Sequence, residues 1–337
     1  RNINFILVLG LIFTSRAMFG QDLIYSQFYA MPMTVNPAFA GNNSCNYRIS
    51  AIGRSQWMGV NNVNSYKSAT LAGDFNLNNN YDDKLNLWGL GGIVSYDKSG
   101  LGNFTNFNLL ANIAYHLRFG REANNFLSFG IQAGAAQRGV NPEDFRYDDE
   151  IDRFGRYYRN TSESIIHPSI WYPEMGFGAM LTINPSENVN AFFGTSIFHI
   201  LNPNISYTST EYKLPSRINF HAGANIYKNG WLFLPSIYVQ NQNLTNYNIG
   251  GYFGRILKPS NEVQDPIIGY LGAWLKSSDA IAAAFRLDFG KLSIAFSYDI
   301  HTGGVSKNLN AIGSPELSLN YFGCFGRDTR RSGCPSL

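Results

Sequence analysis

The chain has 337 residues, of which 15% are charged and 15% aromatic, and its 26 Lys and Arg nearly balance 23 Asp and Glu. Soluble domains carry about 25% charged residues, so this composition is poor for a surface that faces water. The near-neutral balance gives nucleic-acid binding no electrostatic support, because that function needs an excess of positive charge. Beyond the N-terminus no apolar run reaches the ~20 residues of a membrane-spanning helix, so helical membrane proteins are excluded. A closed β-barrel in a membrane is not excluded, since its apolar residues alternate with polar ones along each strand and form no long apolar run.

The first 20 residues have the layout of a secretory signal peptide. Arg1 precedes an apolar stretch over residues 3–13, and the small residues Ala17 and Gly20 lie near the expected cleavage site. No break in composition follows, so we expect a single domain. The sequence therefore predicts four parts: a signal peptide over 1–20, an N-terminal periplasmic or luminal segment over 21–45, a β-barrel over 46–325 and a periplasmic C-terminal tail over 326–337.

The chain after this segment alternates between two kinds of side chain with the two-residue period of β-strands. In residues 281–300, apolar residues such as Phe285 and Phe296 share one face, and the other face is small and polar. Gly290 and Lys291 between them suit a two-residue hairpin turn. We expect about 14 strands, most of them near the 9–11 residues that cross hydrocarbon: 46–56, 66–76, 85–96, 104–117, 126–138, 171–183, 189–200, 216–227, 231–240, 246–257, 267–276, 279–289, 292–300 and 316–324.

This pattern predicts an all-β fold, a transmembrane antiparallel β-barrel of about 14 strands in the outer membrane. A charge that faces lipid near the midplane costs about 2–4 kcal/mol, so Arg217, Arg286 and Asp288 are expected to face the lumen. Tryptophans near strand ends are expected in aromatic girdles at the two membrane surfaces. They are Trp88, Trp171, Trp231 and Trp274.

Connection lengths predict the orientation of this barrel. If the first strand leaves the periplasm, the tight turns Asn229-Gly230 and Gly290-Lys291 fall on the periplasmic side. The long connections 139–170, 201–215 and 301–314 then fall outside. Short periplasmic turns and long extracellular loops are typical of outer-membrane barrels.

Motifs at both ends of the chain resemble one known family. Tyr25-Ser-Gln-Phe-Tyr-Ala, Asn36-Pro-Ala-Phe-Ala-Gly41 and Arg54-Ser-Gln-Trp57 follow the signal in this order, as in the PorP/SprF-like proteins of Bacteroidetes. Residues 315–321, Pro-Glu-Leu-Ser-Leu-Asn-Tyr, resemble the last strand of the family, and Cys334-Pro335 resembles its closing Cys-Pro. Pro315, where an aromatic residue or His is more familiar, and the additional Cys324 depart from the family pattern.

The resemblance implies an outer-membrane accessory of the type IX secretion system that helps to deliver or anchor a secreted surface protein. The partners it implies are a secreted adhesin or its C-terminal sorting domain, and periplasmic secretion-ring or peptidoglycan-binding components. Gliding motility is the process that some members serve. The lipid bilayer is the partner that the strands themselves predict. The alternative is a passive porin-like channel for small solutes, which rests on the polar inner face alone.

The segment ahead of the barrel is the favoured site of partner binding. An apolar stretch interrupted by prolines is not needed for barrel closure, so it is expected to plug the lumen or dock a partner; packing on the periplasmic rim is the structural alternative. The candidate residues are Tyr25, Gln27, Phe28, Tyr29, Asn36, Pro37 and Phe39.

The cysteines suggest a disulfide at the barrel seam. Cys45 precedes the first predicted strand and Cys324 ends the last, and closure makes those strands neighbours. A disulfide from Cys45 to Cys324 or Cys334 is therefore predicted in an oxidising compartment, with free thiols as the alternative.

No residue pattern indicates an enzyme, a metal or a cofactor. The acidic residues Asp148, Asp149, Glu150 and Asp152 lie among Arg146, Arg153, Arg156 and Arg159, which favours a salt-bridged loop over a calcium site. A barrel lipase needs its catalytic set on the outer wall, whereas Ser297 and Asp299 are predicted to face inward, so no enzymatic activity is expected.

Overall fold

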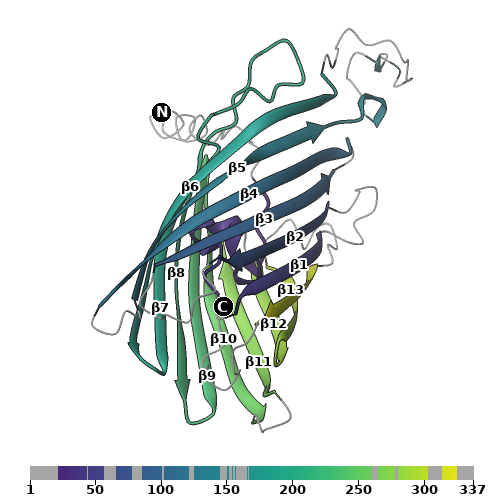
Figure 1. The fold of residues 1–337 in the computed structure, drawn as a ribbon. Helices are drawn as coiled ribbons and strands as arrows, with labels where there is room; N and C mark the ends of the chain where they lie inside the picture. Colours follow the sequence, from purple (N-terminus) through teal and green to yellow (C-terminus); the bar gives the residue numbers. More distant parts are fainter. Residues whose placement is uncertain are drawn as a thin grey trace, which may run out of the picture.

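The computed structural model describes residues 22–43, 45–56, 66–77, 86–100, 102–120, 125–144, 150–151, 154, 156, 165, 167–259, 265–277, 280–302 and 313–324. The predicted signal peptide and C-terminal tail, with Cys334, Trp57, Asp148, Asp149 and Asp152, lie outside these residues. Fourteen strands of the described chain form one closed antiparallel barrel, in which each strand pairs with its chain neighbours and β14 returns to β1 (Figure 1). The predicted fold class is thereby confirmed.

The strands match the predicted ranges closely. The largest differences are in β3, which begins and ends later than predicted, and in β6, which is longer than predicted at both ends. Their bounds are β1 (Tyr47–Gln56), β2 (Tyr66–Asn76), β3 (Leu87–Ser99), β4 (Phe104–Phe119), β5 (Asn125–Gly139), β6 (Ser169–Ser186), β7 (Val189–Phe198), β8 (Arg217–Lys228), β9 (Trp231–Gln242), β10 (Leu244–Lys258), β11 (Ile267–Lys276), β12 (Ala280–Phe289), β13 (Leu292–His301) and β14 (Ser314–Gly323). Short helical turns are η1 (Phe28–Ala30), α2 (Pro32–Val35), η2 (Pro37–Phe39) and η3 (Pro142–Asp144). Among the described residues, no helix has the length and apolarity to cross a membrane.

The two faces of each strand differ as the alternation predicts. Phe285 pairs with Phe296 in the β12–β13 register. These rings are 45% and 47% exposed on the outer wall, whereas Ala282 and Asp299 are fully buried inside. The hairpin between them turns at Gly290, whose φ of 56° lies in the left-handed region that glycine tolerates.

The barrel has two different rims. One, called the short-turn rim here, carries the connections 187–188, 229–230 and 290–291; the opposite, long-loop rim carries 140–168, 199–216 and 302–313. At the short-turn rim the hairpin residues Asn229 and Gly230 both have positive φ, the requirement of a type I′ turn.

The prediction of an aromatic girdle is wrong for one of the four tryptophans. Trp88, Trp171 and Trp231 are 44%, 60% and 41% exposed, but Trp274 is only 2% exposed and packs inside the lumen. The reason is strand parity: Trp274 lies two residues before Lys276, which also faces inward, so both belong to the polar face of β11.

Candidate functional site

Residues 22–43 lie inside the barrel and are called the luminal segment here. In Figure 1 their short helical turns are the purple elements enclosed by the strands. Pro32 and Pro37 each begin a helical turn, where their missing N–H costs no hydrogen bond. Asn36 caps the second of these turns by accepting the backbone N–H of Ala38 at 2.9 Å. The prolines and the cap thus fold the segment into compact turns that fit within the wall.

Glycines on the inner wall make room for the luminal segment. A Cβ at Gly178 would lie 2.0 Å from Asn36 Oδ1, and a Cβ at Gly130 would lie 2.3 Å from the backbone N of Ala38. Both distances are shorter than any allowed contact, so these strand positions tolerate only glycine while the segment is in place. The sequence of the wall is therefore fitted to the segment.

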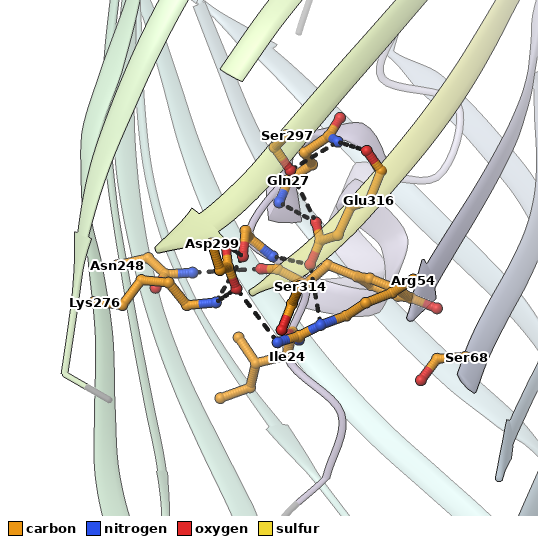
Figure 2. Close-up of polar contacts among 12 residues, drawn as sticks. Ile24, Gln27, Arg54, Ser68, Asn248, Lys276, Ser297, Asp299, Ser314 and Glu316 are labelled. Carbon is orange, nitrogen blue, oxygen red and sulfur yellow. Dashed lines mark hydrogen bonds and ion pairs between the residues drawn. The ribbon is translucent and has the colours of Figure 1, made fainter. Parts of the chain in front are cut away.

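Glu316 of β14 binds the luminal segment at Ser26 and Gln27 (Figure 2). Ser26 and Gln27 donate their backbone N–H groups to the two carboxylate oxygens of Glu316, at 2.8 and 3.0 Å. The Gln27 side chain donates to Ser297 Oγ at 3.0 Å and accepts from Ser318 Oγ at 2.6 Å. Gln27 is fully buried, and these bonds replace the water that it loses.

Two cations and two carboxylates meet at this point. Arg54 lies 3.4 Å from both Glu316 and Asp299, and Lys276 Nζ lies 2.7 Å from Asp299 Oδ2. Ser26 Oγ accepts from Lys276 at 2.6 Å and donates to Asp299 at 2.6 Å. The residues Arg54, Lys276, Asp299 and Glu316, called the latch here, come from β1, β11, β13 and β14. Their charges cancel, as charges in a low-dielectric site must.

Aromatic contacts hold the next part of the segment. The Tyr29 ring stacks on Trp274 at a centroid distance of 5.1 Å, and its hydroxyl lies 2.6 Å from that of Tyr252. Phe28 stacks on Tyr238 at 5.2 Å. These rings form an apolar cluster inside the lumen, which explains why Trp274 faces inward.

The first residue of the luminal segment, Asp22, is held at the long-loop rim. Asp22 lies 2.9 Å from Arg217 and 3.6 Å from Arg138, and it also contacts His199. His199 Nδ1 lies 2.8 Å from Glu174 Oε2 on its other side. Burial disfavours the charged imidazole and by itself lowers the pKa of His199. The carboxylates of Asp22 and Glu174 outweigh this effect of burial and raise the pKa of His199 to about 9.

The predicted partner-binding residues all contact the inner wall. Tyr25 bonds Thr70 at 2.8 Å, and the ring of Phe39 lies 5.0 Å from that of His221. Asn36 donates to the carbonyl oxygen of Ala179 at 3.0 Å, and Pro37 follows it in the buried turn. Together with Gln27, Phe28 and Tyr29, they are buried in the lumen.

The other predicted site residues lie as follows. Arg217 contacts Asp22, as described above. Arg286 and Asp288 form a bidentate pair on β12 at 2.7 and 2.9 Å, and both are buried inside. Cys45 and Cys324 form a disulfide that joins the residues flanking β1 and β14 at the short-turn rim. Within the described part of the chain, no group of three or more His, Cys, Asp or Glu is placed to hold a metal ion.

Sequence reasoning did not anticipate the latch. Lys276 and Glu316 share the inward parity of Asp299, so the two-residue alternation alone would have placed all three in the lumen.

A cavity of about 100 Å³ remains between the luminal segment and the wall near Tyr25, Asp97 and Asn108, with room for several water molecules.

Comparison with known proteins gives one family match. The profile of a family described as type IX secretion system membrane protein PorP/SprF matches residues 17–321. No curated protein matches the chain. Among solved structures, the Pseudomonas putida toluene transporter TodX has a TM-score of 0.43 and 11% identity, covering 89% of this chain and 93% of that one. The CymD monoaromatic hydrocarbon channel has a TM-score of 0.43 and 7% identity, with coverage of 88% and 94%. Salmonella typhi OmpF in complex with daunomycin has a TM-score of 0.35 and 9% identity, with coverage of 82% and 96%.

Proposed function

Because the chain belongs to the type IX secretion system membrane protein family PorP/SprF, we propose that it helps to deliver or anchor a secreted surface protein. It is an outer-membrane β-barrel of that system. The proposed cargo is an adhesin, recognised through its C-terminal sorting domain. The proposed periplasmic partners are secretion-ring or peptidoglycan-binding components, and gliding motility is a process that such anchoring serves. Family membership is the observation that carries this proposal.

The occupied lumen supports an accessory role over a passive channel. A porin-like channel needs a continuous aqueous path, and the luminal segment lies across it with Ala38 and Ala40 fully buried. The seven predicted partner-binding residues are buried as well. A partner therefore reaches them only if the segment leaves the lumen, and otherwise binds other surfaces of the barrel.

The proposed role is non-enzymatic. Ser297 is 1% exposed and bonds Gln27, and Asp299 is fully buried within the latch. Both side chains bind the luminal segment inside the barrel. They therefore lie away from the lipid, which is the substrate of a barrel lipase.

Loss of the gene in its native host, with re-expression as the control, tests the proposal. We expect the surface protein to disappear from the cell surface and to return on re-expression. We also expect the tagged full-length barrel to copurify with that protein and with a periplasmic component. Unchanged surface proteins, together with a large steady conductance of the purified barrel, would instead support the porin-like alternative.

A further inference from the structure

The lipid-facing wall carries an unbalanced set of charges. Along each described strand, every second side chain points outward, on the same face as the exposed apolar residues. The charged side chains on this outward face of the described strands are all cations, and all lie near strand ends. They are Lys67 on β2, Lys98 on β3, Lys228 on β8 and Arg255 on β10. Outward carboxylates that would neutralise them are absent from the described strands. The described strands therefore offer these cations no counter-charge on the lipid-facing wall.

Two of these cations flank one tryptophan at the short-turn rim. Lys228 pairs with Trp231 in the β8–β9 register, and Trp231 pairs with Arg255 in the β9–β10 register. Directly opposed residues on neighbouring strands have their Cβ atoms about 5 Å apart. The three side chains therefore form one row across three strands, next to the turn at 229–230.

The neighbours of this row fix its depth in the membrane. The guanidinium carbon of Arg255 lies 4.8 Å from the centre of the Trp231 ring, and the Phe253 ring stacks on the same indole at 4.8 Å. Phe253 is 53% exposed and Phe233 is 48% exposed, so the wall beside the row is apolar. Indole rings favour the level of the lipid headgroups. Lys228 and Arg255 thus lie at headgroup depth, with apolar wall towards the membrane centre.

Both cations are available to a ligand. Within the described part of the chain, no carboxylate lies within ion-pair distance of Lys228 or Arg255. The stack on Trp231 leaves the Arg255 N–H groups to form hydrogen bonds, and a guanidinium binds a phosphate with two parallel bonds. A lysine ammonium beside it adds a second charge.

We propose that Lys228, Trp231 and Arg255 form a binding site for the phosphate of a phospholipid headgroup. The phosphate lies between the guanidinium and the ammonium, and the glycerol backbone lies against the exposed part of Trp231. The acyl chains follow the exposed rings of Phe253 and Phe233. This site is separate from the lumen and from the proposed secretion role.

Native mass spectrometry of the full-length barrel in detergent tests the site. The probes are dioleoylphosphatidylglycerol and dioleoylglycerol, which differ by the phosphate-bearing headgroup. We expect the wild-type protein to retain the first lipid and not the second. Arg255→Gln and Lys228→Gln should each weaken retention by about tenfold, because each removes a charge-assisted contact.

The matched control is Lys213→Gln, which removes one positive charge from a loop side chain that is 64% exposed. It should retain the phospholipid like the wild type. Circular dichroism and the Cys45–Cys324 disulfide on non-reducing gels report whether each variant is folded. Because Lys228 and Arg255 lie on different strands, either folded variant decides the question. Equal retention of both lipids, unchanged retention in a folded variant, or equal loss in Lys213→Gln overturns the proposal.

Discussion

The carboxylate of Glu316, on the strand that closes the barrel, accepts the backbone N–H of Ser26 at 2.8 Å. This bond joins the luminal segment to the seam between β1 and β14, because Arg54 of β1 contacts the same carboxylate at 3.4 Å. The seam is thus held at two levels, by the latch inside the lumen and by the Cys45–Cys324 disulfide at the short-turn rim.

Replacement of Glu316 by Gln should release Ser26 and Gln27 of the luminal segment from the wall. The amide leaves Arg54 without a full counter-charge and turns an N–H donor towards the backbone donors of Ser26 or Gln27. Loss of one partner from a buried ion pair typically costs about 3–5 kcal/mol. We expect a lower urea midpoint and faster protease cleavage within the segment. Glu211→Gln, in the exposed pair with Lys213, is the control and should change neither.

Substitution of the wall glycines should displace the luminal segment although the sequence of the segment itself is unchanged. In Gly178→Ala the new methyl group overlaps Asn36, and in Gly130→Ala it overlaps the backbone at Ala38. Overpacking of this kind costs about 1–3 kcal/mol. Limited proteolysis should therefore cut within residues 22–43 more rapidly in both variants. Gly53→Ala, where nothing lies within 4 Å of the added Cβ, is the control. If it is cut as fast as the others, a specific fit between glycine and segment is excluded.

Removal of the disulfide should loosen the seam. Cys45→Ser and Cys324→Ser should each lower the free energy of unfolding by about 2–5 kcal/mol, because the bond joins distant parts of the chain. Urea unfolding under non-reducing conditions measures this, and peptide mapping identifies the pair. Cys334→Ser should leave the midpoint unchanged. An equal effect of Cys334→Ser would mean that this cysteine takes part in the pairing.

The contact between His199 and Asp22 should make stability depend on pH. The folded pKa of His199 is about 9, above its ordinary value of 6.5, so its contribution is complete below pH 6.5 and is lost as pH rises through 9. The loss is at most about 3 kcal/mol for a shift of this size. His199→Gln should flatten the stability profile between pH 6.5 and 9.5. A wild-type profile that is already flat there contradicts a charged His199.

Alternation in the sequence was enough to predict the barrel. Phe285 and Phe296 lie opposite each other on the lipid face as the hairpin pattern requires. The position of Trp274 near a strand end predicts a girdle residue, whereas the parity that it shares with Lys276 correctly places it in the lumen. The contact of Ser26 with Glu316 spans most of the chain. It depends on where the luminal segment lies, which two-residue periodicity does not specify.

Ion conductance in planar lipid bilayers tests most directly whether the luminal segment closes the barrel. The wild-type protein should conduct little, because residues 22–43 occupy the lumen. Deletion of these residues, with Cys45 kept, should produce a large and steady conductance if the barrel still forms, which circular dichroism and the intact disulfide verify. A wild-type conductance that is already large, and that the deletion leaves unchanged, shows that the segment does not close the lumen.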